Sequence, residues 1–174
     1  MGRDKATLEL DGQAMGVRVS DALRAAGAQD VVAIGGDAVA LRALGLTAIA
    51  DDEPGAGPFA ATLTALRWAS TEVLAVLSCD LLAPNPAAIT LMVTRLEAAP
   101  SAVVAAVPVV HGHHQWTHVA WRRRAALTAL EEARNRGEGS LRRACADLPL
   151  VLATDVMAGD VADADQPRDL PGAG

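Results

Sequence analysis

Short apolar runs alternate with amphipathic helical patterns along the whole chain. Apolar residues recur at helical spacing over residues 15–26, 37–44, 58–69, 86–98, 125–136 and 140–147, which predicts helices there. Short apolar runs predict strands over residues 30–36, 46–50, 73–78, 102–109, 118–121 and 150–153. Strands that alternate with helices imply an α/β layered fold with right-handed crossovers. The run 73–78 is apolar on both faces, so we expect it in the middle of a parallel sheet.

Length and composition support a single domain over residues 1–174, with an acidic C-terminal tail over residues 155–174. The chain is 51% hydrophobic and 21% charged, which excludes wholesale disorder. Its net charge of −6 argues against a nucleic-acid partner. The longest apolar run, residues 102–110, is too short to span a membrane, and the N-terminus does not resemble a signal peptide. Two cysteines are too few for a disulfide framework, so we expect a cytoplasmic protein.

Aspartates follow several of the predicted strands. Asp51 and Asp80 each come directly after one, and Asp163 and Asp165 lie in the tail. In open α/β sheets, ligands bind at the carboxyl ends of the strands. A carboxylate there is suited to Mg²⁺, which prefers hard oxygen ligands and substrate phosphates. The alternative for Asp80 is a helix cap or a turn residue.

Other polar groups are ambiguous by themselves. The acidic loop 51–58 could bind a nucleoside or be an ordinary solvated loop. His111, His113, His114 and His118 fit no standard zinc spacing. Cys79 is expected to be a small buried residue. Lys5 is the only lysine in the chain, among basic residues that are otherwise all arginine.

The first twelve residues, MGRDKATLELDG, resemble the second part of the signature L-x-G-G-x-S-x-R-M-G-x-D-K. This signature is typical of the molybdenum cofactor guanylyltransferase-like family, within the glycosyltransferase-A-like NTP transferases. Further segments resemble later family motifs in the same order: AIAD at 48–51, GPFAA at 57–61, CD at 79–80, VAWRR at 119–123, GSLR at 139–142 and DADQPRDL at 163–170.

The resemblance implies a three-layer α/β/α Rossmann-like nucleotidyltransferase fold with a mostly parallel sheet. It also implies a reaction, in which a terminal phosphate on molybdopterin attacks the α-phosphate of GTP and pyrophosphate is released. Lys5 would neutralise the triphosphate, Asp80 and Asp165 would hold Mg²⁺, and Asp51, Gly57 and Pro58 would bind the nucleotide.

Several readings stay open beside this one. The chain could instead be a molybdopterin cytidylyltransferase, which uses CTP. It could also be a nucleotidyltransferase that acts on another small substrate. A non-catalytic, degenerate nucleotide-binding protein is the alternative of a different class. The expected partners are therefore GTP or CTP and molybdopterin, and the expected state is a monomer or weak homo-oligomer.

The family's first strand and the glycine-rich start of its loop have no counterpart in these 174 residues. In the family that strand lies inside the sheet. We therefore expect the predicted strands 30–36 and 73–78 to lack a shared neighbour, or to close the gap and pair directly. We also expect the 174-residue chain to bind GTP poorly and to be less stable than a version extended upstream.

Overall fold

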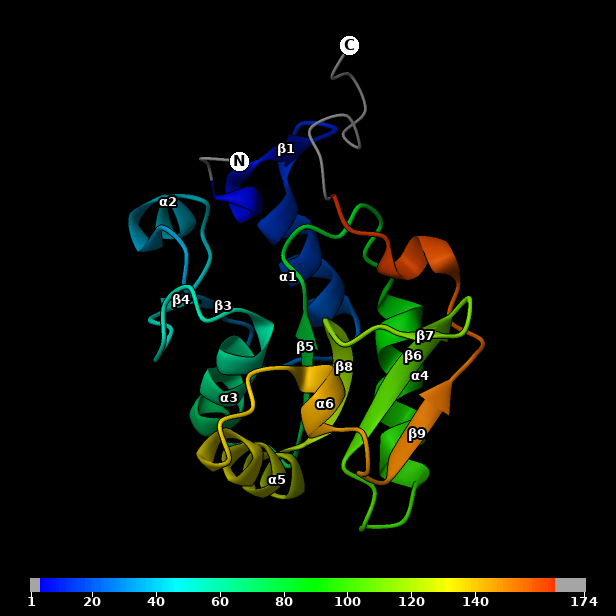
Figure 1. Ribbon diagram of the computed structural model, residues 1–174. Helices are drawn as coiled ribbons and strands as arrows, with labels where there is room; N and C mark the ends of the chain where they lie inside the picture. Colours follow the sequence, from blue (N-terminus) through cyan, green and yellow to red (C-terminus); the bar gives the residue numbers. More distant parts are fainter. Residues whose placement is uncertain (1–3, 165–174) are drawn as a thin grey trace.

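Helices and strands follow each other in the predicted order in the computed structural model, which describes residues 4–164 (Figure 1). The helices are α1 (Met15–Ala25), α2 (Ala38–Ala43), α3 (Pro58–Trp68), α4 (Pro86–Ala98), α5 (Arg123–Asn135) and α6 (Leu141–Ala144), with 3-10 helices η1 (Lys5–Thr7) and η2 (Ala158–Val161). The strands are β1 (Glu9–Leu10), β2 (Gln13–Ala14), β3 (Ala33–Ile34), β4 (Ala48–Ile49), β5 (Val73–Leu77), β6 (Ala105–Val110), β7 (His113–His114), β8 (His118–Arg122) and β9 (Leu150–Ala153).

Local sequence signals set several of these boundaries. Asp11 and Gly12 both have positive φ in the tight turn between β1 and β2, where such backbone matches the twist of a hairpin. Pro86 begins α4, and the Asn85 side chain accepts a hydrogen bond from the Ala87 amide at 2.9 Å. Proline is favoured in a first helical turn because its missing N–H has no intrahelical partner there.

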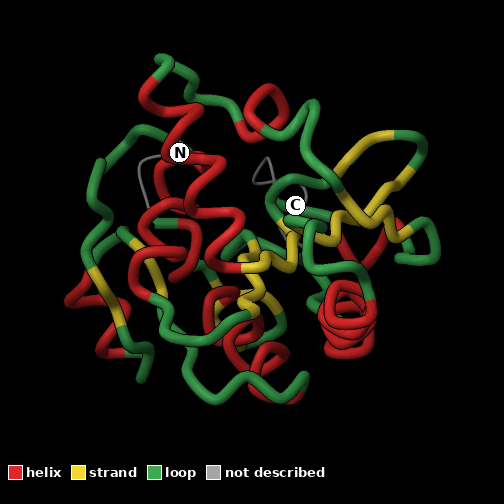
Figure 2. The backbone as a smooth tube through the Cα atoms, turned by 90° about the horizontal axis from the view of Figure 1, so that it is seen from below, coloured by secondary structure: helices red, strands yellow, loops and turns green. Residues whose placement is uncertain are grey.

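Helices cover both faces of the main sheet, which gives the expected three layers (Figure 2). Val119 and Trp121 on β8 belong to one buried cluster, together with residues of α3 and α5. Ala120 between them belongs to a second buried cluster with Met92 and Leu96 of α4. Alternate residues of a strand point to opposite faces, so β8 contributes to both halves of the core.

The sheet is not mostly parallel, which corrects the expectation from the sequence. Its strand order is β5-β8-β6-β7, with β9 on β6, and of these pairs only β6 with β9 is parallel. The connection from β6 to β8 explains the difference. Only residues 111–117 separate the two strands, and a parallel crossover needs a dozen or more residues. Because helices cover both faces of the sheet, the sequences of β5 and β8 are mainly apolar on both sides, as in a parallel sheet.

The strand β5 lies at one end of this sheet rather than in its middle, within residues 4–164. Strands β3 and β4 form a separate parallel pair (Figure 1). A cavity of about 950 Å³ is lined by residues of both β3 and β5. The expected alternative, in which these two strands pair directly, is not seen in the described part of the chain.

The described part of the predicted tail contributes to the fold. Val156 and Val161 are buried in the cluster that includes α4. No helix within residues 4–164 is both long and apolar enough to cross a membrane.

Candidate functional site

Lys5 and Asp80 meet at the carboxyl end of β5, although they are 75 residues apart in sequence. Lys5 Nζ lies 2.6 Å from Asp80 Oδ2 and 3.0 Å from the carbonyl oxygen of Ala164. The Asp80 side chain is 6% exposed, whereas the Lys5 side chain is 34% exposed. The carboxylate is therefore nearly buried, whereas part of the Lys5 side chain is open to solvent.

Asp80 is held in its ionised form. Burial by itself raises the pKa of the Asp80 carboxyl, but hydrogen bonds donated by Lys5 and Ser78, together with the charge of Lys5, outweigh it and lower the pKa from its ordinary value. The Ser78 hydroxyl donates to Asp80 Oδ1. A metal ligand must be deprotonated, so this environment keeps Asp80 ready for that role.

A second carboxylate lies on the neighbouring chain segment. Leu81 and Asp163 form an antiparallel bridge, and the Ala164 amide donates to the carbonyl oxygen of Asp80 at 2.9 Å. The Asp163 side chain is 28% exposed. Asp165, the other predicted metal ligand, lies outside the described residues.

The position of Lys5 is fixed by the residue before it. Asp4 Oδ1 accepts from the Ala6 amide at 3.0 Å, and Asp4 Oδ2 accepts from the Asp37 amide at 2.9 Å. Gly36 has a φ of +72°, and a Cβ atom there would collide with Asp4 Oδ2. The end of β3 thus packs directly against the start of η1.

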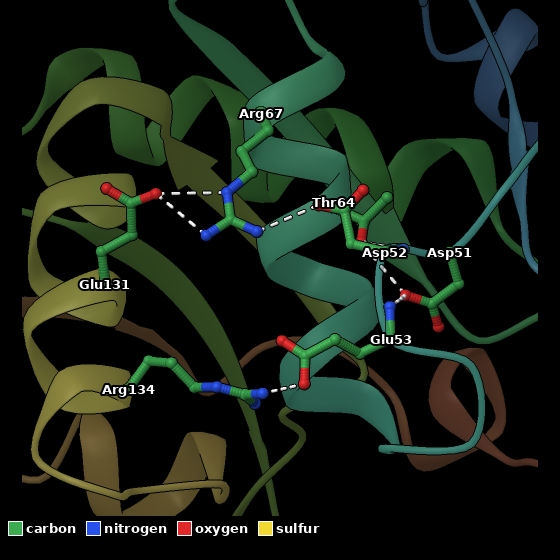
Figure 3. A network of polar contacts seen from close by, with 7 residues as sticks. All are labelled: Asp51, Asp52, Glu53, Thr64, Arg67, Glu131 and Arg134. Carbon is green, nitrogen blue, oxygen red and sulfur yellow. Dashed lines mark hydrogen bonds and ion pairs between the residues drawn. The ribbon is translucent and has the colours of Figure 1, made fainter.

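The Asp51 carboxylate is held both by its own loop and by helix α3 (Figure 3). Its Oδ1 atom accepts from Thr64 Oγ1 and from the Glu53 amide, both at 3.1 Å. A Cβ atom added to Gly35 would lie 3.5 Å from Asp51 Cβ. The Gly35–Gly36 turn therefore connects the surroundings of Asp51 with those of Asp4 and Lys5.

Other residues of the Asp51 loop form ion pairs with two helices (Figure 3). Arg67 of α3 lies 3.0 Å from both Asp52 and Glu131 of α5. Glu53 pairs with Arg134 of α5. These ion pairs hold the acidic loop against α3 and α5, although most of its residues are exposed.

Gly57 and Pro58 form the start of α3, at the far end of the same loop. Gly57 is the N-cap with a φ of +82°, and Pro58 is in the first turn. Both residues are exposed, and nothing lies within 4 Å of a Cβ atom added to Gly57. They are thus open to a ligand, and they share the loop with Asp51.

The carboxylate oxygens of this site are of the kind that Mg²⁺ prefers as ligands. Within residues 4–164 no group of three or more His, Cys, Asp or Glu side chains is arranged to hold a metal ion. Mg²⁺ does not need such a group, because it is commonly bound by one or two carboxylates together with substrate phosphates and water. Asp80 offers one carboxylate of the kind that Mg²⁺ accepts, and Asp163 lies on the adjacent segment.

Cys79 differs from expectation, because it is exposed rather than buried. The surrounding protein and the negative charges of Asp80 and Asp4 nevertheless raise the pKa of its thiol to about 11. The thiol is therefore protonated at neutral pH and is a poor nucleophile.

Sequence reasoning missed two groups that contact the site residues or their neighbours: Ser78 and Asp4. Ser78 and Asp4 each lie within two residues of a predicted site residue, which was a usable signal. The four histidines named in the sequence analysis differ in burial. His113 and His114 are exposed on β7, whereas His118 is 1% exposed at the start of β8.

This geometry places a lysine and a carboxylate at a strand end, with an ordered acidic loop nearby, in a three-layer α/β fold. A fold of this kind is shared with enzymes that transfer nucleotidyl groups. Residues 1–151 match the family model of the MobA-like NTP transferase domain, and the chain belongs to that family.

Solved structures show the same fold. Molybdopterin-guanine dinucleotide biosynthesis protein A from Archaeoglobus fulgidus matches with a TM-score of 0.75 and 20% identity, over 99% of this chain and 89% of that chain. 2-C-methyl-D-erythritol 4-phosphate cytidylyltransferase from Thermus thermophilus matches with a TM-score of 0.72 and 18% identity, over 95% and 89%. A nucleotidyl transferase from Methanothermobacter thermautotrophicus matches with a TM-score of 0.71 and 16% identity, over 95% and 81%. None of the curated proteins matches the sequence significantly.

Proposed function

We propose that this protein transfers a nucleotidyl group from a nucleoside triphosphate, GTP in the first instance, to the terminal phosphate of molybdopterin. An oxygen of the acceptor phosphate forms a bond to the α-phosphorus of the nucleotide. The bond from the α-phosphorus to the bridging oxygen breaks, and pyrophosphate leaves with the electron pair. The observation that carries the proposal is the Lys5–Asp80 pair at the end of β5, in a chain of the NTP transferase family.

Each residue has a role set by its chemistry. Lys5 offers a compact positive charge to the phosphates. Asp80, with Asp165, would hold Mg²⁺, which when bound neutralises charge on the phosphate oxygens. Asp51 would bind the nucleoside through Oδ2, because its Oδ1 atom already accepts two hydrogen bonds. Gly57 and Pro58 would line the nucleotide site at the start of α3.

Two alternatives rest on specific observations. Transfer of CMP from CTP is one, because the cytidylyltransferase from Thermus thermophilus shares the fold. A nucleotide-binding protein without catalytic activity is the other, because Lys5, the proposed partner of the triphosphate, forms an ion pair with Asp80. We further propose that the protein is cytoplasmic and is a monomer or weak homo-oligomer.

A nucleotide panel tests the proposal. The natural protein is incubated with molybdopterin, Mg²⁺ and each of GTP, CTP, ATP and UTP, and the release of pyrophosphate and the formation of a dinucleotide are followed. We expect turnover with GTP. Turnover with CTP alone would replace the nucleotide assignment, and binding without turnover of any nucleotide would favour the non-catalytic alternative.

A further inference from the structure

A buried histidine lies beside the Lys5–Asp80 pair. His118 begins β8 and is paired with Leu77, the last residue of β5. The next pair along the two strands is joined by a hydrogen bond of 2.8 Å from the Ser78 amide to the carbonyl oxygen of Thr117. Asp80 follows two residues later. His118 is therefore fixed next to the strand end that carries Asp80.

The position of His118 is one that an apolar side chain would normally fill. Its exposed fraction is 1%, and the residues that follow it on β8 are Val119, Ala120 and Trp121, all buried. Burying an imidazole is unfavourable unless its nitrogens find hydrogen-bonding partners. The reason for a histidine here should therefore be found in what its ring contacts.

The ring contacts one carboxylate. His118 Nε2 lies 3.3 Å from Asp163 Oδ1, and both atoms are buried. The two atoms lie within contact distance without the geometry of a hydrogen bond, and within residues 4–164 neither has any other hydrogen-bond partner. The other ring nitrogen, Nδ1, lies 3.1 Å from Thr117 Oγ1. An ionised carboxylate can only accept, so a hydrogen bond between the two would need a proton on Nε2. In a neutral ring with that proton, Nδ1 would accept from the Thr117 hydroxyl.

Asp163 connects the ring to the site. It lies on the segment that forms a bridge with Leu81, and the next residue, Ala164, donates its amide to Asp80. The carbonyl oxygen of Ala164 accepts from Lys5 Nζ at 3.0 Å. A change in the position of Asp163 would therefore move an acceptor of Lys5 and a neighbour of Asp80 together.

We propose that His118 is a positioning residue of this site, holding Asp163 from inside the protein and, through Asp163, the segment that contacts Asp80 and Lys5. It touches no reacting atom. Its effect on turnover rests on the proposed function, whereas its effect on the position of Lys5 does not.

Kinetic variants test the first part. His118→Leu keeps a buried side chain of similar size and removes the donor. We expect kcat to fall by about 10–100-fold, the range seen when a group that orients a ligand is removed, with little change in the nucleotide KM. His118→Gln places an amide N–H near the position of Nε2 and should restore much of the activity. In an Asp163→Ala background, His118→Leu should have no further effect, because the two residues act as one unit.

A control separates positioning from loss of stability. Leu130→Ala removes a fully buried side chain of α5 and should lower the melting temperature at least as much as His118→Leu. At a temperature where both variants are folded, it should leave kcat unchanged. Equal losses of kcat in the two variants, or strictly additive losses in the His118 and Asp163 double variant, would overturn the proposal.

The second part is tested without any turnover. Lys5 is the only lysine, so labelling with ¹⁵N,¹³C-lysine gives one side-chain NMR signal. We expect this signal to shift in His118→Leu and to return towards its original position in His118→Gln. The ring ¹⁵N spectrum of His118 should show the proton on Nε2 and should change in Asp163→Asn. An unchanged Lys5 signal, or a proton on Nδ1 only, contradicts the proposal. Failure of the proposed function shows separately as absence of pyrophosphate release by the wild type.

Discussion

The candidate site contains an ion pair whose two members differ in exposure. Asp80 is nearly buried and Lys5 is partly open to solvent. Burial raises the pKa of the Asp80 carboxyl, but hydrogen bonds from Lys5 and Ser78, with the charge of Lys5, lower it below its ordinary value. The same contacts fix the position of the Lys5 ammonium group. Both residues could be predicted from sequence, since one follows a strong strand and the other lies in a recognisable motif.

At the scale of single residues, we predict that the Lys5→Arg variant does not keep wild-type activity. The ammonium group of Lys5 fits between Asp80 and the Ala164 carbonyl at 2.6 and 3.0 Å. The planar guanidinium of arginine is larger and has a different reach. We expect Lys5→Arg and Lys5→Ala both to lower kcat/KM for the nucleotide, by about tenfold or more. Steady-state kinetics with each variant check this, and wild-type kinetics for Lys5→Arg would contradict it.

The lowered pKa of Asp80 predicts how its contribution to stability changes with pH. An unfolded aspartate titrates near about 3.9. Because the folded pKa is lower, the contribution is complete above that pH and is lost as the pH falls through the folded pKa. Unfolding by urea should therefore show a constant stability difference between wild type and Asp80→Asn from neutral pH down to about 5, and a shrinking one below about 4.

A matched control for this pH experiment is Asp155→Asn, which removes an exposed carboxylate paired with Arg95. Exposed pairs contribute about 0–1 kcal/mol. A stability difference for Asp80→Asn as small as that of Asp155→Asn at neutral pH would show that the Lys5–Asp80 pair does not stabilise the fold.

At the scale of elements, the contact between β3 and η1 depends on a glycine. Gly36→Ala adds a Cβ atom against Asp4 Oδ2, whereas Gly45→Ala, with nearly the same positive φ, meets nothing within 4 Å. Both variants place alanine in a left-handed conformation that costs about 1–3 kcal/mol. Only Gly36→Ala also displaces Asp4. We expect Gly36→Ala to lower the melting temperature further than Gly45→Ala and to reduce activity, as measured by calorimetry and kinetics. Equal effects of the two variants would contradict the role of Asp4 in joining β3 to η1.

Element positions were largely predictable from sequence, and their pairing was not. The predicted helix over residues 86–98 and strand over residues 150–153 match the structure residue for residue. The direction of β8 could not be predicted from apolarity, because a strand covered by helices on both faces reads the same in either direction. The short connection over residues 111–117 was the usable signal. The contact of His118 with Asp163 joins distant segments, and no local pattern predicts it.

At the scale of the whole molecule, the main sheet has one edge that faces a cavity. The Ser78 amide donates to Thr117, and the Arg123 amide donates to the carbonyl oxygen of Glu72. In an antiparallel pair only alternate residues bond across the ladder, so the amides of Leu74 and Val76 point to β8. Those of Val73, Ala75 and Leu77 point to the cavity between β5 and β3.

This edge predicts an alternating pattern of hydrogen exchange along β5. We expect the amides of Leu74 and Val76 to be protected, and those of Val73, Ala75 and Leu77 to exchange much faster. Residue-resolved NMR measures both sets in the same strand, so each amide serves as a control for its neighbours. Uniform protection would show that another segment pairs with this edge in solution.

In the proposed function, Asp80 takes part in metal-dependent nucleotidyl transfer. The most direct test of this claim is pyrophosphate release from GTP in the presence of molybdopterin and Mg²⁺, measured for wild type and for Asp80→Ala, with Asp155→Asn as the control carboxylate variant. We predict that wild type and Asp155→Asn release pyrophosphate at the same rate, only while Mg²⁺ is present. Asp80→Ala should be slower by about a hundredfold or more while remaining folded. Equal rates for Asp80→Ala and wild type, or a rate indifferent to removal of Mg²⁺ by a chelator, would contradict the claim.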